Sequence, residues 1–363
     1  MASIKDFADA LNKISLMPKP PQKPQRRKEP EKKEPENKVP EKKGSRPAAQ
    51  VQKLDFGRCW RYNYGLLSQG ERKIYEEMEK AILGGVPEII VACSFEPTLE
   101  RMMGILIYLI EDNPVLFYVN NGLSLATRGR EAKIIFSYNR FFKDREKYLS
   151  QMKAETEKIY ESELKNCKTQ YEIENAIHDY FVKNVTYDPS DAEACHSPIG
   201  PLLWKKGVCE GIAEAVGFIA CACGLDVAMI SGKLEKEAHR WNIIRLDGKN
   251  YHLDITSDLK MPHSFLNCND KMMQSSHSFT RKTGCTSLDY NYYMINKSWF
   301  GTLPEAEKYI GGCAKSGQKE IEFYIEEAPQ PKAVFEAVSK YMKPGTRLGI
   351  NSSNNGHYKI IIS

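Results

Sequence analysis

The sequence has no apolar run long enough to cross a membrane as a helix. A membrane-spanning helix needs roughly 20 consecutive apolar residues, and the 363 residues contain no such stretch. The first residues, MASIKDFADAL, also lack the apolar centre of an export signal. We therefore expect a protein without a transmembrane segment and with a cytoplasmic location.

The sequence also lacks the motifs that usually mark a metal or cofactor site. Its ten cysteines form no CxxC pair, and its seven histidines form no HExxH motif. The closest cysteines, Cys221 and Cys223, are two residues apart in a helical pattern, so their side chains diverge. We expect no cofactor, no metal and mostly reduced thiols.

A basic surface for nucleic acid is missing as well, although the formal net charge is +5. Residues 18–47 contain 11 Lys or Arg and 5 Glu, a net charge of +6, so the remaining residues sum to −1. The excess of positive charge therefore belongs to one segment, and nucleic acid is not an expected partner.

That segment also predicts disorder. It carries eight prolines and no aromatic residue, so it buries too little apolar area to offset the entropy of ordering. Residues 18–51 are therefore predicted to be a disordered linker. Ahead of it, residues 1–17 place apolar side chains at helical spacing, which predicts a short amphipathic helix. This helix either docks onto a protein partner or a membrane surface, or it packs locally or frays.

The composition becomes globular from residue 52, and we divide the rest into three parts. Residues 52–141 read as an α/β N-terminal domain with helices at 71–83 and 98–112 and with strands at 87–94, 115–119 and 133–138. Residues 142–300 begin with long, charged, solvated helices and hold the chemistry. Residues 301–363 repeat a helix, strand, helix, strand pattern, which suggests an internal repeat of the N-terminal domain.

A thiol stands between two glycines in the segment GVCEG, residues 207–211. Apolar residues at the helical period follow Cys209 until Gly224, so Cys209 is expected in the first turn of a buried helix. Unpaired N–H groups and the helix dipole favour a thiolate there. Glu210 opposes this effect unless its carboxylate points away and pairs elsewhere.

A histidine and an aspartate are expected to meet on a β-hairpin downstream. The dipeptide Asp247-Gly248 suits a two-residue turn between the strands HRWNIIRL and KNYHLDIT. If Leu246 pairs with Lys249, the paired positions sum to 495. His239 and Asp254 then become diagonal neighbours on one face, within side-chain reach.

This hairpin leaves the choice of base open. The carboxylate of Asp254 can fix one nitrogen of His239, which leaves the other for a thiol. His252 lies on the same face, opposite Ile243, so the register alone does not exclude it. Trp241, predicted opposite Asp254, is expected to cover the His/Asp pair.

Together these segments resemble a known family. GVCEG at 207–211, AHRWNIIRLDG at 238–248 and YHLDIT at 251–256 are similar to the transglutaminase-like superfamily within the papain-like fold. The segments IHDYFVKNVTYD (177–188) and HSFLNCNDKMMQSSHSF (263–279) resemble those that flank the motifs in bacterial members. The implied fold class is α+β, with a papain-like or transglutaminase-like core between small α/β layers. Two positions depart from the usual pattern, since Ser257 and Ile212 stand where many members have an aromatic residue.

The resemblance implies roles for three residues, namely Cys209 as nucleophile, His239 as general acid and base, and Asp254 as the group that orients His239. An oxyanion hole would need the Cys209 backbone N–H and one side-chain donor. Sequence proximity alone offers candidates for that donor and for the cleft: Trp204, Tyr187, Ser197 and Trp241.

The reaction expected from such a triad is acyl transfer on a peptide or amide bond of a protein or peptide substrate. Water as second nucleophile makes the protein a cysteine protease or amidase, which we favour. A lysine as second nucleophile makes it a protein-glutamine transglutaminase. The remaining alternative is a non-catalytic binding or scaffold module.

Overall fold

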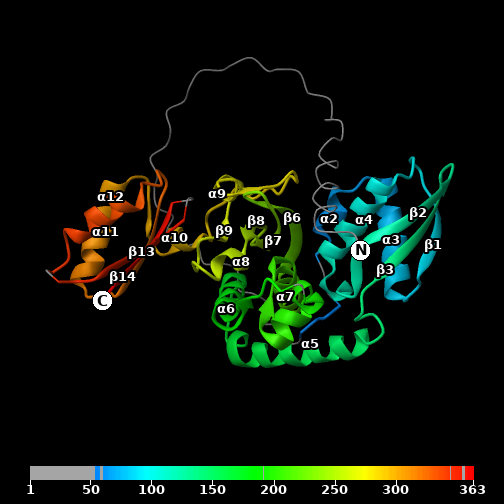
Figure 1. Ribbon diagram of the computed structural model, residues 1–363, viewed down its shortest axis with the longest axis horizontal. Coiled ribbons are helices and arrows are strands. Elements are labelled where there is room, and N and C mark those ends of the chain that lie inside the picture. The colour runs from blue at the N-terminus through cyan, green and yellow to red at the C-terminus, as the bar shows by residue number, and fades with distance from the viewer. Residues whose placement is uncertain (1–53, 58–59, 191, 344, 354–355) are drawn as a thin grey trace, which may run out of the picture.

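The computed structural model describes residues 54–57, 60–190, 192–343, 345–353 and 356–363. The predicted N-terminal helix and linker, residues 1–51, lie outside this part. The described chain mixes helices and sheets, as expected for an α+β protein, and Figure 1 shows a central body with one smaller unit on each side. None of the helices described is both long and apolar enough to cross a membrane.

The N-terminal unit packs helices on one face of a three-stranded antiparallel sheet with the order β1-β3-β2. Its elements are α2 (Tyr62–Leu66), α3 (Gln69–Leu83), β1 (Glu88–Ala92), α4 (Leu99–Asp112), η1 (Pro114–Leu116), β2 (Val119–Arg128) and β3 (Glu131–Tyr138). Ser68 and Glu71 form a capping box that starts α3.

One predicted strand of this unit is wrong. Residues 115 and 116 end the 3-10 turn η1, residues 117 and 118 form a turn, and β2 begins only at Val119. Pro114 stands at the start of η1, where its fixed φ suits a helical turn. The apolar run reflects burial against α7 (Cys209–Ala222), and a short apolar run by itself does not distinguish a strand from a buried turn.

Two helices then lead into the central body, α5 (Arg145–Ile159) and α6 (Gln170–Asn184), with the π-helical turn η2 (Tyr160–Leu164) between them. In Figure 1, α5 runs along the base of the molecule below α6 and α7. The expectation of solvated helices holds for only part of their surface, because each buries one face. Met152 on α5 and Phe181 on α6 are fully buried.

The central body is built on a five-stranded antiparallel sheet with the order β10-β6-β7-β8-β9. The helix α7 packs against β6 and β7. The elements are β4 (Thr186–Tyr187), η3 (Glu193–His196), η4 (Gly200–Trp204), β5 (Lys206–Gly207), α7, β6 (Asp226–Leu234), β7 (Glu237–Leu246), β8 (Lys249–Leu253), α8 (Ile255–Asp258), β9 (Leu266–Cys268), α9 (Asp270–Met273), β10 (His277–Ser278) and α10 (Tyr292–Ile295).

The C-terminal unit has a four-stranded sheet with the order β11-β12-β14-β13, covered by two helices. Its elements are β11 (Trp299–Phe300), α11 (Leu303–Lys315), β12 (Glu320–Ile325), α12 (Pro331–Ser339), β13 (Leu348–Ser352) and β14 (His357–Ile362). The sequence analysis found α11, β12, α12 and β14 but missed the edge strands β11 and β13.

The topology supports the suggested internal repeat. Both outer units run helix, strand, helix, strand, strand, and in both the third of these strands pairs between the other two. In each unit a lysine on that middle strand forms an ion pair with a glutamate at the start of the first strand. The distances are 2.9 Å for Lys133–Glu88 and 2.7 Å for Lys359–Glu320.

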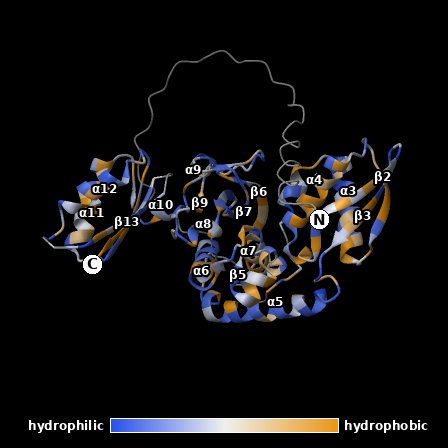
Figure 2. Cartoon of the chain, in the orientation of Figure 1, coloured by the Kyte–Doolittle hydropathy of each residue, from blue (hydrophilic) through white to orange (hydrophobic). Residues whose placement is uncertain are grey.

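The two outer units differ in how they join the central body. The N-terminal unit contributes to one continuous hydrophobic core with the central body, which runs from Ile74 and Ile134 to Val216 and Ile244. Figure 2 shows hydrophobic residues on α3, α4 and the adjoining strands of this unit. The C-terminal unit has a core of its own around Phe323. The core is therefore shared across the domain boundary predicted at residue 141.

Candidate active site

Cys209 is the first residue of α7, as the sequence predicts. Val208 precedes it in an extended conformation as the N-cap, so the Cys209 backbone N–H has no acceptor within the helix. The side chain is half-buried. The thiol therefore lies at the positive end of a helix and still within reach of solvent.

Gly207 and Gly211, which flank the thiol, lie where a side chain would clash with neighbouring atoms. A Cβ at Gly207 would lie 2.6 Å from the Pro201 side chain, and one at Gly211 would lie 2.3 Å from the Cys195 carbonyl oxygen. These separations are shorter than any side chain tolerates. The segment before the helix thus presses directly on the first turn of α7 and fixes where Cys209 sits.

Glu210 points away from the thiol and pairs elsewhere. Its carboxylate forms an ion pair with Arg240, accepts a hydrogen bond from Asn121 Nδ2 at 2.7 Å and lies 3.4 Å from His196 Nδ1. Burial alone would raise the pKa of Glu210, but Arg240 and these hydrogen bonds lower it to about 2. Its negative charge is therefore balanced by the guanidinium on β7.

The predicted hairpin register is confirmed as far as the pair Asn242–Leu253, but the expected pairing of Trp241 with Asp254 does not form. Leu246 pairs with Lys249 and Ile243 with His252. The turn residues Asp247 and Gly248 have φ of 47° and 81°, as a type I′ turn requires. The ladder ends at Leu253, so Asp254 leaves the strand and becomes the N-cap of α8.

His239 lies between the thiol and a carboxylate. Its Nε2 is 2.8 Å from Asp254 Oδ2, and the Cys209 side chain lies close enough to raise the pKa of the imidazole. Since Nε2 faces Asp254, Nδ1 is the nitrogen left for the thiol. Burial would lower the pKa of His239, but the charge of Asp254, their hydrogen bond and Cys209 raise it to about 10. Asp254 therefore favours the form of the imidazole that has accepted a proton.

Asp254 is a more crowded acceptor than the sequence analysis anticipated. His277 Nε2 lies 3.0 Å from the same Oδ2, and Ser257 donates to it from Oγ at 2.5 Å. Burial would raise the pKa of Asp254, but the two histidines lower it far below its usual range. His277 was missed because its segment carried only a general family likeness. Ser257 is one of the two positions that depart from the family pattern.

His252 has other partners. Trp241 Nε1 donates to its Nδ1 at 3.0 Å, and its Nε2 lies 2.8 Å from Asp270 Oδ1. Both ring nitrogens are thus engaged away from Cys209. The Trp241 ring stacks on His239 at a centroid distance of 5.8 Å and is fully buried. This contact agrees with the expectation that Trp241 covers the His239/Asp254 pair.

Of the candidates for the oxyanion and cleft positions, Tyr187 is the one whose hydroxyl is affected by the charge of Cys209 and accepts or donates no hydrogen bond among the described residues. Burial, and then the nearby Cys209, raise the pKa of Tyr187, whose side chain is still 48% exposed. Ser197 is buried and donates to the Ala194 carbonyl, and Trp241 donates to His252. Trp204 is exposed and has no recorded contact with the site.

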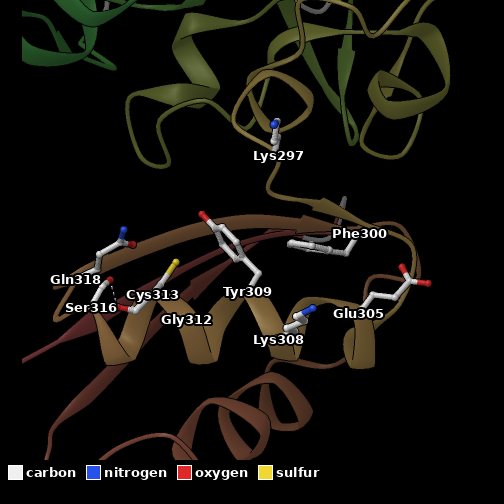
Figure 3. A pocket seen from close by; sticks show the side chains of 9 residues that line it. All are labelled: Lys297, Phe300, Glu305, Lys308, Tyr309, Gly312, Cys313, Ser316 and Gln318. Carbon is white, nitrogen blue, oxygen red and sulfur yellow. Dashed lines mark hydrogen bonds between the residues drawn. The ribbon is translucent and has the colours of Figure 1, made fainter. Parts of the chain in front are cut away.

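A pocket among the described residues lies away from Cys209. It has a volume of about 520 Å³ and sits on the C-terminal unit, where Lys297 faces Tyr309 and Phe300 across the opening (Figure 3). None of the catalytic candidates lines it. The pocket therefore carries no information about the chemistry at Cys209.

Part of the chain is similar to known proteins. Residues 158–255 match the model of the Transglutaminase-like superfamily. This segment therefore resembles that superfamily, as the sequence motifs predicted. No curated protein matches the chain.

Three solved structures are similar to parts of the chain. A candidate cysteine protease from Cytophaga hutchinsonii shares 16% identity at a TM-score of 0.26, covering 36% of this chain and 55% of that one. A TGase shares 14% identity at 0.25, covering 47% and 50%. A candidate protease from Parabacteroides distasonis shares 13% at 0.23, covering 37% and 35%. The chain thus spans between about a third and just over half of these structures.

Proposed function

We propose that this chain is a thiol-dependent acyl-transfer enzyme that hydrolyses a peptide or amide bond of a protein or peptide substrate. Cys209 is the nucleophile, His239 the general acid and base, and Asp254 the group that orients and charges His239. The observation that carries the proposal is the position of one imidazole between a thiol and a carboxylate. The superfamily match supports the same class of enzyme.

The first half of the reaction forms a thioester. His239 takes the thiol proton, and the sulfur of Cys209 attacks the carbonyl carbon of the scissile bond. The imidazolium then donates its Nδ1 proton to the leaving amine, and the carbon–nitrogen bond breaks. Asp254 holds the ring in this orientation and stabilises its cationic form until the proton leaves, because it binds Nε2.

The developing oxyanion needs two donors near the thiol. The Cys209 backbone N–H has no intrahelical acceptor and points out of the helix start. The Tyr187 hydroxyl is the favoured side-chain donor, since Cys209 affects its pKa and it has no hydrogen-bond acceptor among the described residues. Together they supply the stabilisation that acyl transfer requires.

Water is the second nucleophile in this proposal. His239, neutral after the amine leaves, takes a proton from water, which attacks the thioester and releases the carboxylic acid and the thiol. The half-buried Cys209 and the exposed side of Tyr187 leave the thioester open to solvent. Such a site favours hydrolysis over transfer to a lysine.

Selective alkylation of the ten cysteines tests the nucleophile. At pH 6.5, iodoacetamide followed by peptide mass spectrometry should label Cys209 at least tenfold faster than the other cysteines, because its half-buried thiol lies at a helix start beside an imidazole whose pKa is raised. Burial raises the pKa of Cys93 and Cys167 and raises that of Cys223 to about 12. Equal labelling of all ten cysteines would leave only a binding module.

The matched variants for this experiment are His239→Ala and His252→Ala. Both remove a buried histidine of the same sheet face, but only His239 contacts the thiol. The excess reactivity of Cys209 should vanish in the first variant and persist in the second.

The second nucleophile is identified with a peptide library incubated with and without a labelled primary amine. Cleavage in both samples, without incorporation of the label, is the expected result. Incorporation of the amine into glutamine-containing peptides would instead make the protein a transglutaminase.

A further inference from the structure

A cluster of side chains at the seam between the central body and the C-terminal unit has the composition of a transition-metal site. His178 and Asp179 are neighbours on α6, and His263 lies on the loop after α8. One ligand atom from each of the three lies within 4.8 Å of the others. These residues play no part in the chemistry at Cys209.

The separations between the ligand atoms suit a small tetrahedral ion. Asp179 Oδ1 is 2.9 Å from His178 Nδ1 and 3.7 Å from His263 Nε2. Ligands at 2.0–2.1 Å from a tetrahedral zinc ion lie about 3.3 Å apart. The two observed distances bracket this value, and the longer one exceeds an ordinary hydrogen bond.

The second ring nitrogen of each histidine also contacts a carboxylate. His178 Nε2 lies 3.1 Å from Asp258 Oδ2, and His263 Nδ1 lies 3.1 Å from Glu322 Oε2 on β12. Metal-binding histidines are commonly oriented in this way, with the second ring nitrogen bonded to a carboxylate. Two other clusters of histidine and acidic side chains occur among the described residues, but their histidines are engaged in other contacts. His252 accepts a bond from Trp241 on the nitrogen away from Asp270, and His277 shares Asp254 with the active site.

The three side chains of the cluster differ in exposure, so a metal ion could reach them from one side. The His178 side chain is fully buried, His263 is 17% exposed and Asp179 is 56% exposed. An ion would thus enter past Asp179 and keep a water molecule as fourth ligand. The two imidazoles are nearly parallel, and His263 stacks on Tyr292 at 3.8 Å. The His263 ring must therefore tilt off this stack for its lone pair to meet the ion.

We propose that His178, Asp179 and His263 bind one Zn²⁺ ion, which ties the C-terminal unit to the central body through Glu322. Two imidazoles and one carboxylate select a borderline ion such as Zn²⁺ over Mg²⁺ or Ca²⁺, which prefer oxygen ligands. The site is independent of the proposed hydrolase activity, and its test does not use that activity.

The test is a calorimetric Zn²⁺ titration of the full chain in a Cys209→Ser background, after dialysis against a chelator. This background removes the active-site thiol, which is itself a zinc ligand. The expected result is one ion per chain with submicromolar affinity. His263→Ala should weaken binding at least a hundredfold, and Asp179→Asn and Glu322→Gln should each weaken it about 10- to 100-fold.

Cobalt substitution of the wild-type chain separates this site from the active site. Tetrahedral Co²⁺ bound by nitrogen and oxygen gives visible absorption without a thiolate charge-transfer band. A thiolate band in the cobalt spectrum would overturn the proposal. It would also be overturned if Glu322→Gln and Asp179→Asn, each made in the Cys209→Ser background, left the Zn²⁺ affinity unchanged. Absence of Zn²⁺ binding by the folded Cys209→Ser chain would also overturn it. The cluster would then be held together by hydrogen bonds alone.

Discussion

At the scale of single residues, the alkaline limit of activity should depend on Asp254. The pKa of His239 is raised to about 10, and the carboxylate of Asp254 is the strongest group that raises it against burial. The imidazolium is present below this pKa and is lost as the pH rises through it. Activity should therefore fall above about pH 10 in the wild type. In Asp254→Asn the fall should begin at a lower pH, and kcat/KM should drop on the order of 10² to 10⁴-fold.

The chain offers a matched control for this profile. Asp270 holds His252 at 2.8 Å on the same face of the sheet, but neither contacts the thiol. Asp270→Asn should leave the alkaline limb where it is in the wild type. The assignment of Asp254 would be contradicted by an unchanged limb in Asp254→Asn, measured from pH 5 to 11 on a peptide substrate.

How far the sequence predicts the site depends on how each residue is positioned. Cys209, His239 and Asp254 come together as expected, because a helix start and a hairpin register are local features that a sequence encodes. His277 could not be found in this way, since it reaches Asp254 from an edge strand that pairs 43 residues away with Leu234. The sequence gives no sign of such a long-range pairing.

At the scale of elements, the first turn of α7 should tolerate no added carbon at Gly211. A Cβ there would lie 2.3 Å from the Cys195 carbonyl oxygen and 2.7 Å from that of Ser197, both of which are backbone atoms. Gly211→Ala must push the helix start outward and carry Cys209 with it. We expect a loss of stability of about 1–3 kcal/mol and a fall in the alkylation rate of Cys209.

Gly217 provides the comparison on the same helix. Its nearest neighbour to an added Cβ is Pro114 at 3.8 Å, which is ordinary contact. Gly217→Ala should raise stability by up to about 1 kcal/mol, because alanine favours a helix interior, and should leave alkylation unchanged. Denaturant unfolding and the rate of Cys209 labelling measure both effects, and similar behaviour of the two variants would refute the packing argument.

The link between α7 and β7 should depend on the buried ion pair beside Cys209 and His239. Arg240 follows His239 and pairs with Glu210, which follows Cys209, and the guanidinium is buried. Arg240→Met would leave the Glu210 carboxylate buried without this cation, at a cost of about 3–5 kcal/mol in unfolding free energy. Arg245→Met on the same strand removes a more exposed pair with Asp226 and should cost about 0–1 kcal/mol. Equal losses in urea unfolding would contradict the distinction.

The elements themselves were predictable where their signals are local. Caps, turns and amphipathic periods located α3, α4, α7 and the β7–β8 hairpin. The edge strands β11 and β13 were missed because β11 contains only two residues and β13, LGINS, contains a glycine and polar residues. Such strands are stabilised by the neighbours they pair with, which the sequence does not name.

At the scale of the whole molecule, the distribution of the hydrophobic core predicts two unfolding units rather than three. The N-terminal unit and the central body share one core, although a boundary was expected between them, while the C-terminal unit encloses its own. A sequence shows which residues are apolar but not which partners they meet, so a shared core could not be foreseen. The C-terminal unit contacts the central body through the polar contact of Glu322 with His263 and through Tyr324, which joins a smaller hydrophobic cluster of the central body beside Tyr293.

Differential scanning calorimetry of two matched variants tests this division. Ile360 on β14 and Ile244 on β7 are both fully buried strand residues, one in each core. Each Ile→Val change should cost about 0.5–1.5 kcal/mol. Ile360→Val should lower one transition by about 4–8 °C per kcal/mol, as for a unit of 60–100 residues, and Ile244→Val should lower the other by about 2–4 °C per kcal/mol. Because cooperativity follows shared burial, a single transition that moves with both variants would mean that the seam between the units is as strong as either core.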